Sequence, residues 1–385
     1  MSEQKQQIEQ AKNALEKALS ARDQAPKAFV GLDGFIDEIV HVVDQRQDFQ
    51  NYTPIKTIAD YAKRLATAAG KSTNVELVLR QVKMGGNGPL MSDALGRLGT
   101  EVCTAGALGK GTLNPTFERL CEQGPVLSLC DPAVTIAAEF EDGKIMHGQL
   151  QTLDEITYEN LVTAAGGEES LAQTLGGTEL LALVNWTMIP RLTEVMEDIL
   201  KLLEKYSGPT HAFFDFCDPA KRSREDLRRV LGVIGSFTRA VKNPILGLNE
   251  KESWEVCDAL GIEYGEETAD ATLARAQRIA ETVGIPEVVI HPHTFAVAWT
   301  ENEQGISWGP YCKAPRLTTG AGDHFNGGYA FARMAGLSPL DAVTIGTAVS
   351  GFYVRQGHGP SAAHVAEFCD RWMVDTLDPW RDFRA

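Results

Sequence analysis

The segment from Leu317 to Gly328 joins small residues to one acidic side chain at the start of a predicted helix. It contains Gly320-Ala321-Gly322-Asp323 and ends in Gly327-Gly328. Small residues let a backbone approach a ligand closely, and the first N–H groups of a helix lack partners and carry positive potential. This combination suits a phosphate group. An acidic residue that follows an ordinary glycine turn is the alternative explanation.

Two carboxylates follow the first predicted strand, which covers residues 28–30. Asp33 and Asp37 stand four residues apart, just beyond Gly31. A carboxylate can accept hydrogen bonds from several hydroxyl groups, as the recognition of a polyol requires. Solvated acids in a loop would show the same pattern, so these two residues are candidates for substrate binding and no more.

Two further segments have residues suited to polar ligands. The turn Gly85-Gly86-Asn87-Gly88-Pro89 precedes a predicted helix and could present backbone N–H groups. Asn249-Glu250-Lys251-Glu252 follows a predicted strand, and its amide and carboxylate oxygens are hard ligands that suit hydrated Mg²⁺. Asn and Glu also commonly start helices, so a purely structural role is the alternative.

Several familiar motifs are missing from the sequence. Gly70-Lys71-Ser72 resembles the end of a P-loop, but Leu65 stands where the first glycine should be. The chain has no HExxH, no GxSxG and no CxxC pair among its 7 cysteines. A dinucleotide-binding dehydrogenase would require GxGxxG after the first strand, and that pattern is absent there.

Hydrophobic patterning predicts a central sheet with helices around it. The first 24 residues and residues 57–81 show helical spacing. Residues 133–151 alternate as a hairpin around Asp142-Gly143, and its polar face suits a lid. The second half alternates strands (180–184, 211–216, 244–248, 287–291) with helices (190–206, 223–234, 270–283, 323–334, 339–355, 363–377). Such alternation predicts an α/β fold, with a mostly parallel sheet covered by helices on both faces.

Charge and hydropathy narrow the classes of protein. Asp and Glu number 52 against 36 Lys and Arg, a net charge of −16, which disfavours nucleic acid and anionic membranes as partners. The N-terminus has no apolar signal segment, and no apolar run is long enough to span a membrane. We therefore expect a cytoplasmic enzyme or binding protein.

Taken together and in this order, these segments resemble the ribokinase-like (PfkB) family of carbohydrate kinases from about residue 28 to about residue 375. The most specific element is Thr319-Gly320-Ala321-Gly322-Asp323 followed by Phe325 and Gly327-Gly328. The stretch from Gly85-Gly86 to Gly99 resembles the family's diglycine signature. Asn249-x-x-Glu252, Asp218-Pro219 and the segment Gly357-His358-Gly359-Pro360-Ser361 resemble its remaining motifs.

The resemblance implies phosphorylation of a sugar hydroxyl that depends on ATP and Mg²⁺. Asp323 would be the general base, and the backbone of Gly320, Ala321 and Gly322 would stabilise the transferring phosphoryl group. The other implied roles are substrate binding by Asp33, Asp37, Gly86 and Asn87, nucleotide binding by Thr319, Gly357 and Gly359, and metal positioning by Asn249 and Glu252.

The resemblance also implies a domain layout. An N-terminal helix (1–26) would lie outside the family core, and residues 27–385 would form the ribokinase-like domain. The lid strands would fall within 38–56 and 133–151, and they could pair two subunits into a homodimer.

The sequence departs from the family pattern in three places. Leu90 replaces the usual Asn after the diglycine, and residues 291–296 replace a glycine-rich nucleotide segment. Leu317 stands where relatives have an Asp that can help bind a monovalent cation, so we expect weak or no activation by K⁺. The changes at 90 and 291–296 leave open an alternative, a sugar- or nucleotide-binding protein without phosphotransfer.

Overall fold

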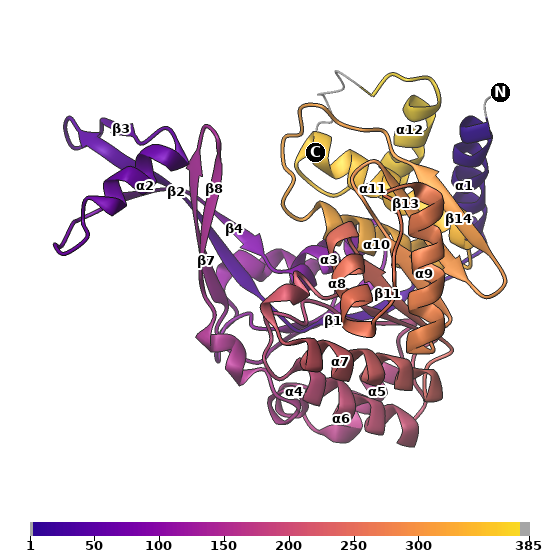
Figure 1. Cartoon of the computed structure of the whole chain (residues 1–385). Coiled ribbons are helices and arrows are strands. Elements are labelled where there is room, and N and C mark those ends of the chain that lie inside the picture. The colour runs from indigo at the N-terminus through magenta and orange to yellow at the C-terminus, as the bar shows by residue number, and fades with distance from the viewer. Residues whose placement is uncertain (1–2, 378–385) are drawn as a thin grey trace.

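A nine-stranded sheet runs through the body of the protein (Figure 1). The computed structural model describes residues 3–377. In spatial order the strands are β14 (Gln304–Trp308), β13 (Phe295–Thr300), β12 (Glu287–Ile290), β11 (Asn243–Leu248), β10 (His211–Phe214), β9 (Leu180–Leu183), β1 (Lys27–Gly31), β5 (Glu101–Gly106) and β6 (Val126–Ser128). All neighbours from β12 to β6 pair in parallel, and β13 and β14 extend one edge in antiparallel pairing.

The parallel strands are short and mainly apolar. All four residues of β9 and all four of β10 are buried. Strands of this kind are buried on both faces, because the crossover helices cover the sheet on each side. The predicted fold class is therefore confirmed.

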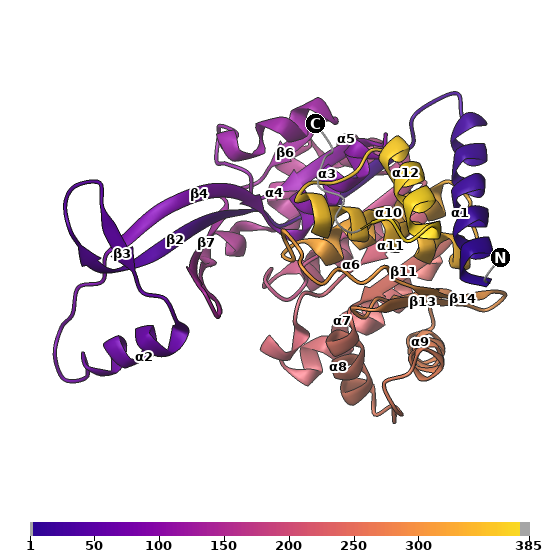
Figure 2. The ribbon, with the colours of Figure 1, turned by 90° about the horizontal axis from the view of Figure 1, so that it is seen from above.

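Helices cover both faces of the sheet (Figures 1 and 2). One hydrophobic core forms under α1 (Glu3–Ser20), α3 (Asn87–Arg97), α10 (Ala321–Met334), α11 (Pro339–Gln356) and α12 (Ala362–Met373). The other forms under α4 (Tyr158–Ala164), α5 (Glu168–Gly176), α6 (Leu192–Lys205), α7 (Arg224–Ser236), α8 (Glu250–Leu260) and α9 (Ala269–Val283). Short 3₁₀ helices are η1 (Pro115–Glu122), η2 (Gln151–Glu155), η3 (Pro219–Lys221) and η4 (Phe237–Arg239).

A second, five-stranded sheet projects from the body as a lid (Figure 2). Its central strand β2 (Phe35–Arg46) pairs with β4 (Leu77–Gly85), β7 (Ala133–Phe140) and β3 (Tyr52–Pro54), and β7 pairs with β8 (Gly143–Gln149). A small core that includes Val40, Ile55 and Tyr61 packs one face of this sheet against α2 (Ile58–Ala66). The hairpin predicted at Asp142-Gly143 is confirmed.

One predicted element is wrong. Residues 57–81 do not form one helix, because α2 ends at Ala66 and β4 begins at Leu77. β4 exists because it pairs with β2, and that long-range contact overrides the local helical spacing. Within residues 3–377, no helix has the length and apolar character needed to cross a membrane.

Candidate active site

The carboxyl ends of five neighbouring parallel strands bring polar residues to one edge of the sheet. Ligands bind at this edge in open α/β sheets. The residues that follow the strands β1, β9, β10, β11 and β12 are Asp33, Asn185, Asp215, Asn249 and His291.

Asp33 is fully buried and holds the glycine-rich turn that precedes α3. Its carboxylate accepts the backbone N–H groups of Asn87 (2.8 Å) and Gly88 (2.7 Å), and the side-chain amide of Asn185 (2.6 Å). Desolvation raises the pKa of Asp33 to about 6, although these hydrogen bonds oppose the shift. Its burial favours a role in shaping the turn over direct contact with a substrate. Gly86 and Asn87, by contrast, remain half-buried.

Asp215 is the second buried carboxyl group at this edge. It accepts the side-chain amides of Asn87 (3.0 Å) and Asn326 (3.2 Å). Desolvation raises its pKa, and the nearby charge of Asp33 adds to the shift. Just beyond it, Cys217 and Asp218 have left-handed backbone conformations (φ of 64° and 65°). Such strain is uncommon outside glycine and is concentrated at functional sites.

Asp323 lies half-buried in the first turn of α10. Its pKa is raised well above the ordinary value, first by desolvation and then by the charges of Asp215, Asp33 and Glu252. These four carboxyl groups therefore share one neighbourhood. A carboxylate whose pKa is raised in this way is a better proton acceptor near neutral pH.

The residues before Asp323 form a tight turn at the N-terminus of α10. Gly320 has φ of 87°, and a Cβ atom there would lie 3.0 Å from both Leu90 Cδ1 and the Tyr353 hydroxyl. A Cβ atom at Gly322 would lie 3.3 Å from His291 Cε1. The turn Thr319–Gly322, called the cradle below, thus leads into the positive end of a helix, where an anion is favoured.

Asn249 and Glu252 form a capping box at the start of α8. The Asn249 side chain accepts the Glu252 N–H (2.9 Å), and Glu252 accepts the N–H groups of Asn249 (2.8 Å) and Asp218 (3.0 Å). Glu252 is 2% exposed, and burial followed by the charge of Asp215 raises its pKa. Within residues 3–377, no three His, Cys, Asp or Glu side chains are grouped to hold a metal ion unaided. The donor set fits a hydrated Mg²⁺ that also takes oxygens from phosphate and water.

Asp37 lies half-buried at the base of the lid, on β2. It stands opposite Lys83 of β4 and Thr135 of β7 in the sheet register. Desolvation raises its pKa, while the hydrogen bond from Thr135 and the charges of Lys83 and Lys144 oppose the shift. Its charge also contributes to the raised pKa of Tyr353, so Asp37 lies within electrostatic reach of the cradle.

The segment after α11 lies beside the cradle. Gly357 ends the helix in a left-handed conformation (φ of 79°). A Cβ atom at Gly359 would lie 3.1 Å from His324 Nε2 and 3.0 Å from Arg97 Cδ. Thr319 is exposed, and its carbonyl accepts the Tyr353 hydroxyl (2.7 Å).

Several polar residues at this edge did not emerge from the sequence. Asn185 and Asp215 follow strands, so their position after apolar runs was an available signal. Asn326 lies one turn after Asp323 on the same face of α10. Tyr353 and His324 gave no signal of their own, because their contacts join separate helices.

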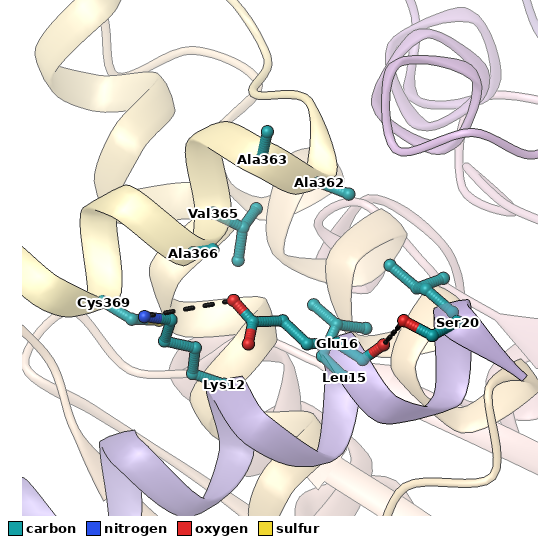
Figure 3. Close-up of a pocket in the computed structure, with 10 residues that line it drawn as sticks. Lys12, Leu15, Glu16, Ser20, Ala362, Ala363, Val365, Ala366 and Cys369 are labelled. Atoms are coloured by element: carbon teal, nitrogen blue, oxygen red, sulfur yellow. Dashed lines mark hydrogen bonds and ion pairs between the residues drawn. The ribbon is translucent and has the colours of Figure 1, made fainter.

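A cavity of about 240 Å³ lies elsewhere, between α1 and α12 (Figure 3). Its lining is largely apolar, with Leu15, Ala362, Val365 and Cys369 among its residues. It therefore lacks the convergent polar groups found at the carboxyl ends of the parallel strands. The candidate active site lies at those strand ends.

Comparison with known proteins identifies the family of this chain from sequence and its fold from solved structures. A family model described as prokaryotic ketohexokinase matches residues 4–372. A ketohexokinase of Haloferax volcanii is 27% identical over 370 residues, which cover 94% of this chain and 96% of that protein.

Solved structures with the same fold include three kinases. Phosphofructokinase-2 of Escherichia coli (15% identity, 91% of this chain and 99% of that one) has a TM-score of 0.60. The nucleoside kinase of Methanocaldococcus jannaschii (15%, 90% and 99%) has 0.58, and the ribokinase of Thermotoga maritima (19%, 90% and 99%) has 0.57. At these identities the likeness shows a shared ribokinase-like fold.

Proposed function

The chain belongs to the prokaryotic ketohexokinase family and is a sugar kinase, a phosphotransferase with an alcohol group as acceptor, and on this premise we propose that it transfers the γ-phosphoryl group of ATP to a hydroxyl group of a ketohexose. The observation that carries the proposal is the position of Asp323. This carboxyl group follows the cradle at a helix N-terminus, and burial, followed by the charges of three other carboxyl groups, raises its pKa.

Asp323 acts as the general base. It accepts the proton of the attacking sugar hydroxyl while that oxygen forms its bond to the γ-phosphorus. The cradle residues Gly320, Ala321 and Gly322 present backbone to the phosphoryl group at the positive end of α10, where developing negative charge is stabilised. The bond between the γ-phosphorus and the bridging oxygen breaks, and ADP leaves.

Asn249 and Glu252 would position Mg²⁺ through water molecules. When bound, the ion neutralises phosphate charge in the transition state. Both side chains already engage backbone groups of the helix start, which supports an indirect role in metal positioning over direct coordination.

Asp37 and Asn87 hold the sugar hydroxyls, with Gly86 beside them. Both polar side chains are half-buried, one on the lid and one on the body. Asp33 supports them by holding the backbone of Asn87. The lid closes over the sugar and excludes water, which would otherwise compete as the acceptor.

The nucleotide lies against Thr319, Gly357 and Gly359. Thr319 belongs to the cradle, Gly359 lies against His324, and the Gly357 N–H donates to the Tyr353 carbonyl. His291 begins the segment 291–296, which replaces the family's usual nucleotide segment, and it lies against Gly322. Since the chain is a phosphotransferase, the alternative of a binding protein without catalysis is set aside.

A homodimer through the lid completes the proposal. The edge strand β4 exposes Leu77, Leu79 and Val82, and each is more than 40% exposed. An apolar edge strand is a surface for pairing with another chain. Sedimentation of the protein with and without Leu79→Lys tests it, and a wild-type monomer would contradict it.

The experiment for the function itself is product identification. Mg-ATP is supplied with ketohexoses, aldohexoses, sugar phosphates and nucleosides in turn, and ADP release and the phosphorylated product are measured. The proposal requires the highest kcat/KM with a ketohexose. Preference for another acceptor would overturn the assignment of the sugar, and no ADP with any acceptor would overturn the kinase activity.

A further inference from the structure

Two aromatic rings pack against the cradle. His324 of α10 and Tyr353 of α11 are stacked, with ring centroids 3.6 Å apart and an angle of 21° between the planes. Both are buried, His324 at 1% and Tyr353 at 5% exposure. Neither residue is among those assigned to substrate, nucleotide or metal above.

Each ring bonds a carbonyl of the cradle. The Tyr353 hydroxyl donates to the Thr319 carbonyl (2.7 Å), and His324 Nδ1 lies 2.8 Å from the Gly320 carbonyl. A carbonyl only accepts, so Nδ1 must carry the proton. Burial lowers the pKa of His324 to about 4, so the ring is neutral and Nε2 holds a lone pair.

These two bonds restrain the most flexible part of the turn. Gly320 has a left-handed conformation, and glycine can leave it at little cost. In a trans peptide the C=O and N–H groups point in opposite directions, so fixing the Thr319 carbonyl fixes the direction of the Gly320 N–H. The Gly320 carbonyl is held twice, by the His324 ring and by the His324 backbone N–H (3.1 Å).

We propose that His324 and Tyr353 are positioning residues for phosphoryl transfer. Their hydrogen bonds to the cradle carbonyls keep the N–H groups of the cradle aligned for the phosphoryl group. The inference rests on the proposed function of the cradle. The pair acts through the backbone of Thr319 and Gly320, and neither ring touches the reacting atoms.

The His324 ring also joins the cradle to the segment at Gly359. His324 Nε2 has no hydrogen-bond partner among residues 3–377, and it lies 3.1 Å from where a Cβ atom of residue 359 would be. A side chain at 359 would therefore push on the ring that holds Gly320. Gly359→Ala should reproduce, from outside the pair, part of the effect of losing it.

The test compares Tyr353→Phe and His324→Phe with Tyr329→Phe as the matched control. Each pair variant keeps an aromatic ring and removes one donor to the cradle. Tyr329 is a buried tyrosine of the same helix α10, but its hydroxyl bonds Glu287, which begins β12 at the far end of the sheet. Thermal unfolding of each variant confirms that it is folded before it is assayed.

Two readouts separate this inference from the proposed function. The first is hydrogen exchange, without ligands, at the amides of Ala321 and His324, which bond the carbonyls of Thr318 and Gly320. Both pair variants should exchange about tenfold faster there and the control should not. The second is kcat, which should fall about tenfold, the effect of roughly 1.4 kcal/mol, while KM for the sugar changes less than about twofold.

The outcomes are decisive in different ways. Unchanged exchange in both pair variants would overturn the inference, whatever the activity. Faster exchange with unchanged kcat would overturn the positioning role, because the turn would then be loosened without consequence for transfer. Absence of turnover in the wild type would instead count against the proposed function, and the exchange result would still show whether the rings hold the turn.

Discussion

Asp33 and Asp215 share one partner, because Asn87 donates its backbone N–H to Asp33 (2.8 Å) and its side-chain amide to Asp215 (3.0 Å). Both carboxyl groups are buried, and both carry charge that raises the pKa of Asp323. The proton affinity of the proposed base, already raised by burial, is therefore raised further by residues that do not need to touch the substrate.

The pH dependence of kcat/KM should reveal the raised pKa of Asp323. Asp323 must be ionised to accept a proton, so activity should fall on the acid side at a pH well above the ordinary carboxyl range. Asp215→Asn removes one neighbouring negative charge, which lowers the pKa of Asp323 and moves the acid limb to lower pH. An acid limb that stays in place or moves to higher pH in Asp215→Asn would contradict the account.

The sequence identifies Asp323 as a candidate base, whereas the end of a strand is only a weak signal for Asp215, and the difference is physical. Gly320–Asp323 is one continuous segment whose residue types already suit a phosphate. Asp215 gains its role from Asn87 and Asn326, which are far away in the chain and approach only when β10, α3 and α10 pack. Local pattern carries no information about such partners.

The same distinction holds for the fold. Short apolar runs such as Leu180–Leu183 predict buried parallel strands directly. The helical spacing of residues 57–81 wrongly predicts a helix through the first part of the strand Leu77–Gly85, whose edge position in the lid leaves only Gly85 fully buried. Its pairing with β2 decides its conformation, and that register is a long-range property.

Asp37→Asn should weaken sugar binding. The proposed contact is a hydrogen bond to a charged group, worth about 1.5–3 kcal/mol, so KM for the sugar should rise roughly ten- to hundredfold. KM for ATP should stay within about twofold. Glu38→Gln is the matched control, because neighbouring residues of a strand point to opposite faces. Equal effects of the two variants would contradict the assignment of Asp37.

Glu252→Gln should raise the Mg²⁺ concentration needed for half-maximal activity. The variant replaces the carboxyl group of a buried residue that we place behind the metal's water shell, and outer-shell changes of this kind typically cost about tenfold or more in metal affinity or activity. Glu255→Gln on the same helix is the control. A Mg²⁺ titration that is unchanged in Glu252→Gln would remove this residue from the metal site.

Replacing Na⁺ by K⁺ at constant ionic strength should change the rate less than about twofold. Leu317 has no side-chain oxygen to offer a monovalent cation, and the carbonyls of Thr319 and Gly320 are already engaged by Tyr353 and His324. The measurement is the initial rate of ADP release in matched salts. A large increase with K⁺ would contradict this prediction.

The most direct test of the central claim is ADP release from Mg-ATP and the preferred ketohexose by Asp323→Asn. Loss of a general base costs roughly 10²–10⁴-fold in rate, so turnover should fall by that factor while the melting temperature stays close to that of the wild type. Asp226→Asn, in the first turn of α7, makes the same change at another helix start and should remain fully active. Full activity of a folded Asp323→Asn enzyme would contradict the mechanism.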